Sequence, residues 1–269
     1  VASTGASAPY NGSSWGNAYT NIQDAVNSAA SGDLVAIKQG YYSITNSESM
    51  VYLSGKNLIL RGGYEGSGTP GAYTNDPWKT VLDGQDETRP LYLANCSSGL
   101  VEGVAITRGR GTRGGGVLVS NTSVVVRNCA LSACKTPSNI SGGGIYCGGT
   151  DVERIVIDGC VFTWNSGTGA EGGGIYTKNI QFLAVTSSVF AMNTAANGAA
   201  MTIAGGSADI FNCLFRNNAP GFISCIKMTS GSCTTTLENC TFEGNKMTAL
   251  QQVSGDIIAE NCIFWRNGS

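Results

Sequence analysis

Apolar and polar residues alternate along most of the chain in runs that are too short for helices. The runs "SVVVRNCAL", "RIVIDGCVF" and "ADIFNCLF" combine period-two alternation with β-branched or aromatic residues, and Asn or Gly interrupts each of them. Alternation of this kind is typical of β-strands, whereas helices need longer stretches with a 3.6-residue period. The pattern therefore predicts an all-β chain of short strands, beginning with "LVAIKQGYY" at Leu34.

Two phrases recur in this pattern at intervals of about one repeat unit. One reads "GGGVLV" at 114, "GGGIYC" at 142, "GGGIYT" at 172 and "GAAMTI" at 198. The other reads "NCALSAC" at 128, "GCVFTWN" at 159, "SVFAMN" at 188, "NCLFRNN" at 212, "NCTFEGN" at 239 and "NCIFWRN" at 261. Self-similarity at a fixed period indicates a solenoid. Units with several short strands predict a parallel β-helix, in which each strand pairs with its equivalent in the next coil about 4.8 Å away.

Equivalent side chains of successive coils should stack along the axis of such a solenoid. We expect an internal phenylalanine ladder from Phe162, Phe190, Phe215, Phe242 and Phe264. We expect an asparagine ladder at the following turn, in the left-handed conformation that Asn tolerates, from Asn165, Asn193, Asn218, Asn245 and Asn267. A third row combines Cys129, Cys160, Ser188, Cys213, Cys240 and Cys262. The glycine phrase should form a corner with positive φ, followed by an inward Ile or Val.

The stretch "TNIQDAVNSAASGD" predicts a short amphipathic helix that covers the N-terminal end of the solenoid. Thr20 precedes Gln23 by the spacing of a capping box, and the helix should end at Gly32. Its apolar face consists of Ile22, Ala25, Val26 and Ala29. We expect a single domain over residues 1–269, with the cap in 1–33, the coils in 34–269 and an irregular loop at 63–78.

The opposite end of the sequence stops within a repeat, at "NCIFWRNGS". An uncovered coil presents unpaired strand edges, which favour pairing with another chain. Either the chain was cut there or another chain covers this edge. In the second case the coil would receive the N-terminal end of a second molecule, which would build head-to-tail fibres.

The segments "SSWGNAYTNIQDAVNSAASGDLVAIKQGYY", "NLILRGGY" and "TVLDG" resemble the opening of secreted bacterial right-handed β-helix proteins of the pectin-lyase-like superfamily. The GGG[IV] and FxxN phrases resemble the repeats of chlamydial polymorphic outer-membrane proteins. The resemblance covers nearly the whole chain and implies a right-handed single-stranded β-helix. It is specific for the fold but does not select a function, because the superfamily includes adhesins, passenger domains, polysaccharide lyases and hydrolases.

The amino-acid composition limits which cellular compartments and which binding partners are expected for this chain. The net charge of −2 does not favour nucleic acid or an anionic membrane surface, and no apolar run is long enough for a transmembrane helix. The chain has ten Cys and no His, so zinc patterns with histidine cannot form and disulfides outside the cytosol are favoured. We therefore expect a secreted, extracellular or cell-surface protein without cofactor or metal.

Two kinds of modification fit that compartment. The cysteines that we expect nearer to turns, and therefore in disulfides, are Cys134, Cys147, Cys225 and Cys233. Asn-x-Ser/Thr triplets, the acceptor sites of N-glycosylation, occur at Asn11, Asn95, Asn121, Asn139, Asn239 and Asn267.

Candidate catalytic groups gather in two neighbouring stretches. The carboxylates are Asp83, Asp86 and Glu87 in "LDGQDETRP", and Arg108 and Arg110 follow about one coil later in "TRGRGTRGGG". These groups would share a face of the solenoid, although turns at a protein surface commonly carry such charges. Lyases of the resembling superfamily use carboxylates with Ca²⁺ and an Arg or Lys base, and hydrolases need two facing carboxylates.

The sequence leaves three functions open. We expect a non-enzymatic extracellular adhesin or structural subunit, because turn chemistry and core stacking account for the repeat. The alternative is a polysaccharide lyase or hydrolase that acts in a groove outside the coils. The third is a carbohydrate-binding module, with Tyr176, Trp164 and Trp265 as side chains that stack on sugars. Expected partners are a second copy, glycans or a host surface.

Overall fold

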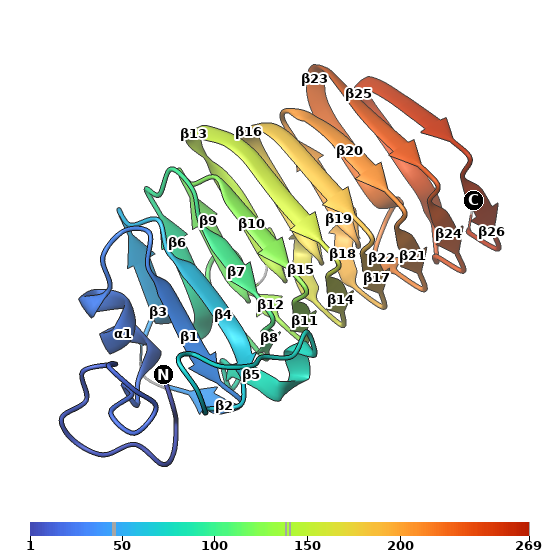
Figure 1. The fold of residues 1–269 in the computed structure, drawn as a ribbon. Helices are drawn as coiled ribbons and strands as arrows, with labels where there is room; N and C mark the ends of the chain where they lie inside the picture. The colour runs from blue at the N-terminus through green and yellow to red at the C-terminus, as the bar shows by residue number, and fades with distance from the viewer. Residues whose placement is uncertain (45–46, 138, 140, 269) are drawn as a thin grey trace.

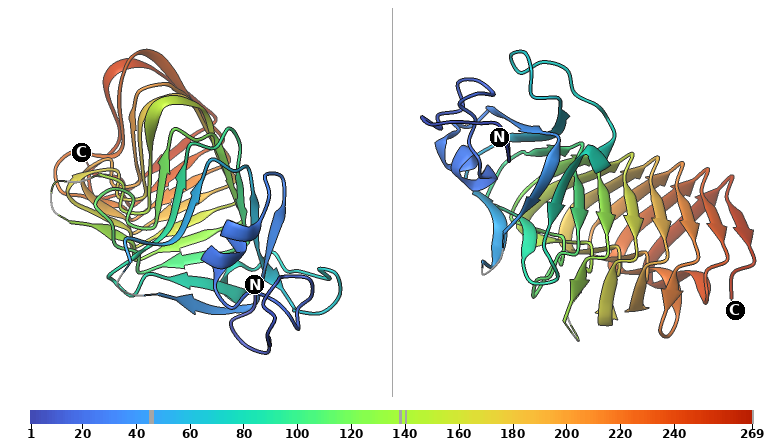
Figure 2. Two further views of the ribbon diagram at one scale, coloured as in Figure 1. Left: turned by 90° about the vertical axis from the view of Figure 1, so that its left-hand side faces the viewer. Right: turned by 90° about the horizontal axis from the view of Figure 1, so that it is seen from below.

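The computed structural model of the protein describes residues 1–44, 47–137, 139 and 141–268. The chain winds into a parallel β-helix, with its coils stacked from the N-terminal to the C-terminal end (Figures 1 and 2). Three sheets run along the axis, and the apolar core lies inside the coils. The predicted all-β parallel β-helix with a short N-terminal helix is therefore confirmed.

The strands of each sheet come from equivalent positions of successive coils. The 13-stranded sheet consists of β1 (Leu34–Lys38), β3 (Ser49–Ser54), β4 (Ile59–Tyr64), β6 (Arg89–Ala94), β7 (Leu100–Glu102), β9 (Val117–Ser120), β10 (Val124–Arg127), β13 (Ile145–Asp158), β16 (Ile175–Thr186), β19 (Met201–Ala204), β20 (Ser207–Phe211), β23 (Ser224–Glu238) and β25 (Thr248–Glu260). The nine-stranded sheet consists of β2 (Gly40–Ser43), β5 (Thr80–Asp83), β8 (Ala105–Thr107), β11 (Ala130–Ser132), β14 (Val161–Thr163), β17 (Val189–Ala191), β21 (Leu214–Arg216), β24 (Thr241–Glu243) and β26 (Ile263–Trp265). The four-stranded sheet consists of β12 (Lys135–Thr136), β15 (Ser166–Glu171), β18 (Thr194–Asn197) and β22 (Ala219–Pro220).

Strict register in the nine-stranded sheet produces the predicted phenylalanine ladder. Each strand pairs in parallel with its equivalent in the next coil, so Phe162, Phe190, Phe215, Phe242 and Phe264 fall in one row. The rings stack with centroids 4.6 to 5.0 Å apart and nearly parallel planes. Stacked rings at this spacing fill the core with close contacts on both faces.

The asparagine ladder is also present, but its backbone conformation differs from the prediction. Asn193 Oδ1 accepts hydrogen bonds from the N–H and the Nδ2 of Asn165, and Asn193 Nδ2 donates to the carbonyl of Phe162. Asn218 and Asn245 continue the same pattern.

The prediction that these residues adopt the left-handed conformation is wrong. The positive φ belongs to the residue before each of them, such as Trp164 at 59° and Met192 at 57°. The asparagines of the "NC" phrase, such as Asn212 at 53°, do adopt it. The ladder asparagines instead direct their amides into the core, where they satisfy backbone groups between two sheets.

The glycine phrase forms the predicted corner. Gly172 has a φ of 68°, and the adjoining Gly173 lies so close to the next coil that a Cβ would be 2.5 Å from the Ala199 carbonyl. The apolar residue after the glycines, such as Ile145 or Ile175, is fully buried. Glycine thus serves two needs at this corner, a left-handed turn and a close approach of coils.

Helix α1 (Ile22–Ser28) covers the N-terminal end of the coils. Its buried residues Ile22, Ala25 and Val26 belong to the core, as predicted. The N-cap is Asn21, whose side chain accepts from the Gln23 N–H, so the predicted cap at Thr20 is wrong, and the helix ends before Gly32. The Gln23 side chain is engaged elsewhere, with the backbone of Tyr52.

The predicted loop at residues 63–78 leaves the coils after β4. It contains an isolated antiparallel bridge between Tyr64 and Tyr73 and runs into the 3₁₀ turn η1 (Pro77–Lys79). This loop reaches back toward the N-terminal segment, since Trp15 Nε1 donates to the Pro70 carbonyl at 2.9 Å.

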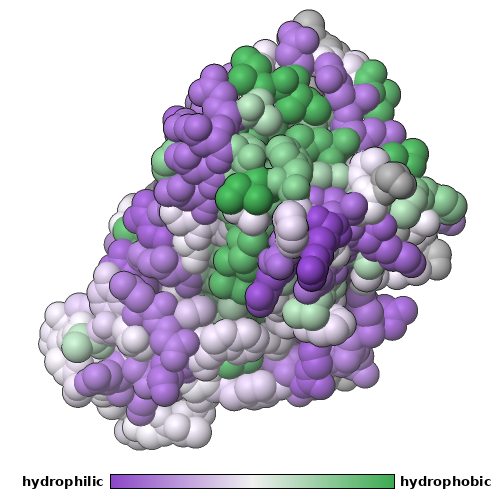
Figure 3. Space-filling model, turned by 90° about the vertical axis from the view of Figure 1, so that its right-hand side faces the viewer, coloured by the Kyte–Doolittle hydropathy of each residue, from purple (hydrophilic) through white to green (hydrophobic). Residues whose placement is uncertain are grey.

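The last described coil has an apolar face that no other coil covers. Apolar side chains gather at this end of the molecule (Figure 3), and those exposed on β25 and β26 are Val253, Ile258, Ile263, Phe264 and Trp265. At the opposite end, α1 and the N-terminal segment lie over the first coil. Docking of a second molecule onto the apolar face stays a prediction.

Asn218→Ala should lower the free energy of unfolding by about 3 kcal/mol, because it leaves buried groups of Asn193 and Phe190 without partners. Urea denaturation followed by circular dichroism measures this loss. Asn75→Ala, in the exposed part of the loop, is the matched control and should change the free energy by less than about 0.5 kcal/mol. Equal losses in both variants would contradict a structural role for the ladder.

Candidate functional site

Two of the predicted catalytic residues meet on the outer surface of the coils. Asp83 ends β5, and Arg108 follows β8 in the next coil because Asp83 pairs with Thr107. Arg108 Nε lies 3.1 Å from both oxygens of the Asp83 carboxylate, and its NH2 group donates to the same carboxylate. The hydrogen bond to Asp83 raises the pKa of Arg108.

A phenol completes this cluster. The Tyr41 hydroxyl of β2 donates to Asp83 and accepts from Arg108 NH2 at 3.0 Å. The backbone N–H of Gln85 donates to Asp83 Oδ1 at 2.8 Å. Asp83 is only 3% exposed, so several donors already engage a nearly buried carboxylate. Sequence reasoning missed Tyr41, which pairs with Val81, two residues before Asp83, and reaches the carboxylate along the strand.

The other three predicted residues do not join this cluster. Asp86 lies 2.6 Å from Lys135 Nζ, a partner that no motif in the sequence indicates. The side chains of Glu87 and Arg110 are exposed. Asp86 is thus paired with Lys135, and Asp83 could act as a general base only through lone pairs that it already shares with Tyr41 and Arg108.

Other charged side chains form ion pairs of the same kind on the outer surface. Arg61 Nε lies 2.7 Å from Glu102, and Arg127 Nε lies 3.2 Å from Asp158. Lys227 is paired with Glu171. All six ion pairs among the described residues join side chains of different coils, and two of them, Arg61–Glu102 and Arg127–Asp158, join direct register partners.

The predicted sugar-stacking residues differ in what they offer. Tyr176 points outward from β16, but its ring stacks on that of Tyr146 with centroids 5.3 Å apart. This ring face is therefore covered. Trp164 is 61% exposed at a turn, and Trp265 carries Arg266 over its ring. Trp164 thus has the most exposed ring of the three.

The cysteine row forms as predicted. The thiols of Cys129, Cys160, Cys213, Cys240 and Cys262 each donate to the carbonyl two residues earlier, at 3.2 to 3.4 Å. Ser188 Oγ makes the same bond, to Thr186, and accepts from the Cys160 N–H. A hydroxyl that replaces one thiol of the row therefore keeps the bond to the carbonyl two residues earlier and adds an acceptor for the neighbouring coil.

The predicted disulfides are not supported, because the ten cysteines of the structure are free thiols. Cys134, Cys147 and Cys225 are buried instead of lying at exposed turns, and Cys233 is partly exposed. Cys134 occupies the position of the asparagine ladder that precedes Asn165. The Cys134 N–H donates to Asn165 Oδ1 at 3.1 Å. Burial raises the pKa of Cys134 to about 12, and it also raises the pKa of Cys147 and Cys225.

The predicted glycosylation sites lie at corners and loops. Asn11, Asn95, Asn139 and Asn239 are exposed, and Asn121 is partly exposed. Asn267 belongs to the asparagine ladder, where its Nδ2 donates to the Phe242 carbonyl. Glycosylation at the remaining sites stays a prediction.

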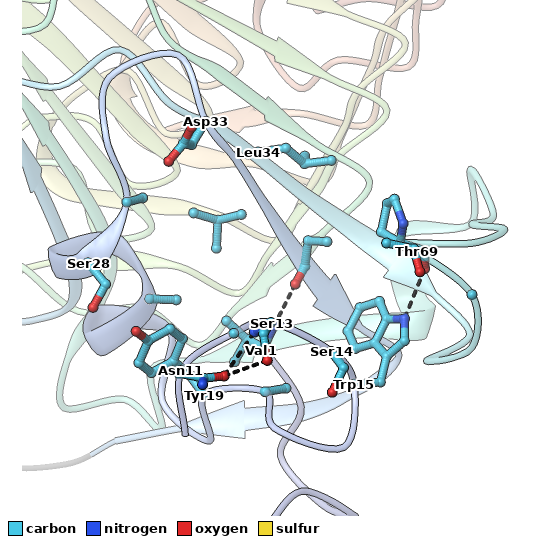
Figure 4. Close-up of a pocket in the computed structure, with 18 residues that line it drawn as sticks. Val1, Asn11, Ser13, Ser14, Trp15, Tyr19, Ser28, Asp33, Leu34 and Thr69 are labelled. Atoms are coloured by element: carbon cyan, nitrogen blue, oxygen red, sulfur yellow. Dashed lines mark hydrogen bonds between the residues drawn. The ribbon is translucent and has the colours of Figure 1, made fainter. Parts of the chain in front are cut away.

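A cavity of about 520 Å³ lies at the N-terminal end, which the sequence did not indicate (Figure 4). The N-terminal segment, α1, β1 and the loop after β4 form its walls. Its labelled residues surround an open space, with Tyr19 and Ser28 on one side and Trp15 and Thr69 on the other. A cavity of this size can hold a small ligand.

The described part of the chain offers no group of three or more Cys, His, Asp or Glu side chains that could hold a metal ion. No helix in that part is long and apolar enough to cross a membrane.

Comparison with known proteins gives one match. A family model described as a right-handed β-helix region matches residues 88–264, which is more than half of the chain. No curated protein and no solved structure matches significantly.

The buried thiols predict a stability that declines in alkali. Unfolded thiols ionise near their ordinary pKa of 9.0, whereas Cys134 in the fold stays neutral until about pH 12. The free energy of unfolding should therefore be unaffected by this thiol below pH 9 and fall above it, by about 1.4 kcal/mol per pH unit for this thiol. Urea denaturation between pH 8 and 10.5 measures the slope. Cys134→Ala should reduce the slope by about that amount, while Cys147 and Cys225 maintain the remainder, and an unchanged slope would contradict this assignment.

Proposed function

The chain belongs to the right-handed β-helix family, and from this premise we propose that it is a non-enzymatic extracellular or cell-surface protein, acting as an adhesin or structural subunit. A β-helix is stiff along its axis because each coil is bonded to the next, which suits a protein that holds a binding surface away from its anchor.

The observation that carries this proposal is the use made of the charged side chains. Four carboxylates each form an ion pair with an arginine or lysine of another coil, namely Asp83, Glu102, Asp158 and Glu171. Pairs of this kind hold two coils in one register and engage these four carboxylates in structural contacts. The charges therefore favour a rigid rod over an enzyme.

A polysaccharide lyase or hydrolase is the second candidate. It is favoured by the cluster of Tyr41, Asp83 and Arg108, which brings a phenol, a carboxylate and a guanidinium together outside the coils. In the first proposal this cluster only links three successive coils.

Two assays on the full 269-residue chain separate the candidates. Beads coated with the protein should be retained on surfaces that carry glycans or host cells. Incubation with acidic and neutral polysaccharides, with and without Ca²⁺, should release no unsaturated or reducing ends. Asp83→Asn should leave bead retention unchanged, since in this proposal the carboxylate has no part in binding.

The opposite result has a clear signature. Product release that Asp83→Asn abolishes, and that the exposed control Asp209→Asn retains, would make the protein an enzyme and reverse the order of the two candidates. Bead retention no greater than that of uncoated beads would overturn the adhesin and leave the structural subunit.

A further inference from the structure

The cavity at the N-terminal end is built by four segments that are distant in the sequence. It is lined by residues 11–15 and 18–19 of the N-terminal segment, by α1, by β1 and by residues 68–70 of the loop. Figure 4 shows Asp33 and Leu34 at one wall, and Ser13 and Asn11 at the opposite one. The cavity therefore lies at the end of the rod, outside the stack of coils.

Several contacts hold the walls in place without a ligand. Trp15 Nε1 donates to the Pro70 carbonyl at 2.9 Å, and its ring lies 5.9 Å from that of Tyr64. Ala2 donates through its N–H to the Tyr19 carbonyl at 2.9 Å. These contacts tie the N-terminal segment to the loop, to β4 and to itself, so a ligand would meet a largely preformed site.

The lining combines small apolar residues with two aromatic rings and several polar side chains, and it is almost without charge. Trp15 and Tyr19 lie on opposite sides of the space. The remaining polar side chains are hydroxyls, an amide and one carboxylate, from Ser13, Ser14, Ser28, Thr69, Asn11 and Asp33. No lysine or arginine is among the lining residues. The Asp33 carboxylate is fixed at the wall, because its Oδ2 accepts from the Ala30 N–H at 2.8 Å.

We propose that this cavity binds a short neutral saccharide. Aromatic rings pack against the apolar faces of sugar rings, and the hydroxyl, amide and carboxylate groups match a ligand with many hydroxyls. An anionic sugar would bring its charge near Asp33, and the lining supplies no cationic side chain to offset it.

An extended peptide fits this space less well. β1 is the edge strand of its sheet, so a peptide could add to it. However, Val1 already pairs with that edge, because its nitrogen donates to the Ala36 carbonyl and its carbonyl accepts from the Lys38 N–H. Only a short part of the strand, near Leu34, is left for pairing, while hydroxyl groups line the walls beside it.

The inference goes beyond the proposed function, because an adhesin and an enzyme could both carry a saccharide site at the end of the rod. Its failure would leave the bead and turnover assays unaffected. Conversely, product release in the turnover assay would contradict the adhesin proposal without contradicting saccharide binding in the cavity.

Isothermal titration of the full chain with neutral mono- and disaccharides, and with uronic acids of the same size, tests the inference. At least one neutral saccharide should bind with one site per chain, and the uronic acids should bind at least tenfold more weakly. Trp15→Ala and Asp33→Ala should each weaken the neutral ligand at least tenfold, which is about 1.4 kcal/mol.

Trp78→Ala is the matched control. Trp78 is exposed at the end of the loop whose residues 68–70 line the cavity, but it does not itself line the cavity. It should bind as the parent does. Because Trp15→Ala also removes the contact with Tyr64, a second variant, Ser28→Phe, fills the cavity from an exposed position of α1. It should keep the parent's circular dichroism and lose binding.

Three results would overturn the inference. One is the absence of binding by every neutral saccharide at millimolar concentration. Another is binding that Ser28→Phe retains, which would place the saccharide elsewhere. The third is selective binding of an extended peptide that Ser28→Phe abolishes, which would make the cavity a peptide site on β1.

Discussion

The structure depends on the in-register stacking of one coil on the next. A single coil cannot bury its interior, and each edge strand has unpaired backbone groups, so both needs are met only by another coil in the same register. Backbone pairing supplies this within the sheets. At the turn after the phenylalanine row the strands end, and the amides of Asn165, Asn193, Asn218 and Asn245 continue the hydrogen bonding between coils.

The same register acts on the outer surface. An outward residue faces its equivalent in the next coil, so Arg61 meets Glu102 and Arg127 meets Asp158. Opposite charges in such positions stabilise the register, whereas like charges would oppose it. The outer surface of the coils is therefore constrained by the repeat, almost as the core is.

Departures from the repeat are where the chain is free to build a site. The first coil has no preceding coil, and α1, the N-terminal segment and the loop after β4 take its place. These segments do not repeat, so their side chains need not match equivalents in other coils. The cavity beside Trp15 lies among them, while the coils supply the rigid base of the site.

The sequence by itself determined the solenoid, the rows of Phe, Asn and Cys, and the glycine corners, because periodic stacking repeats the same local chemistry in every coil. It did not determine which asparagine would be left-handed. That depended on whether the Asn193 side chain made hydrogen bonds to the backbone of its own turn or to that of the neighbouring coil. It placed Cys134 and Cys147 near turns, because a buried thiol and a bridged one look alike in sequence. Only the tertiary structure decided the contact of Tyr41 with Asp83 and the cavity beside Trp15. Each joins segments that no repeat or motif in the sequence relates to one another.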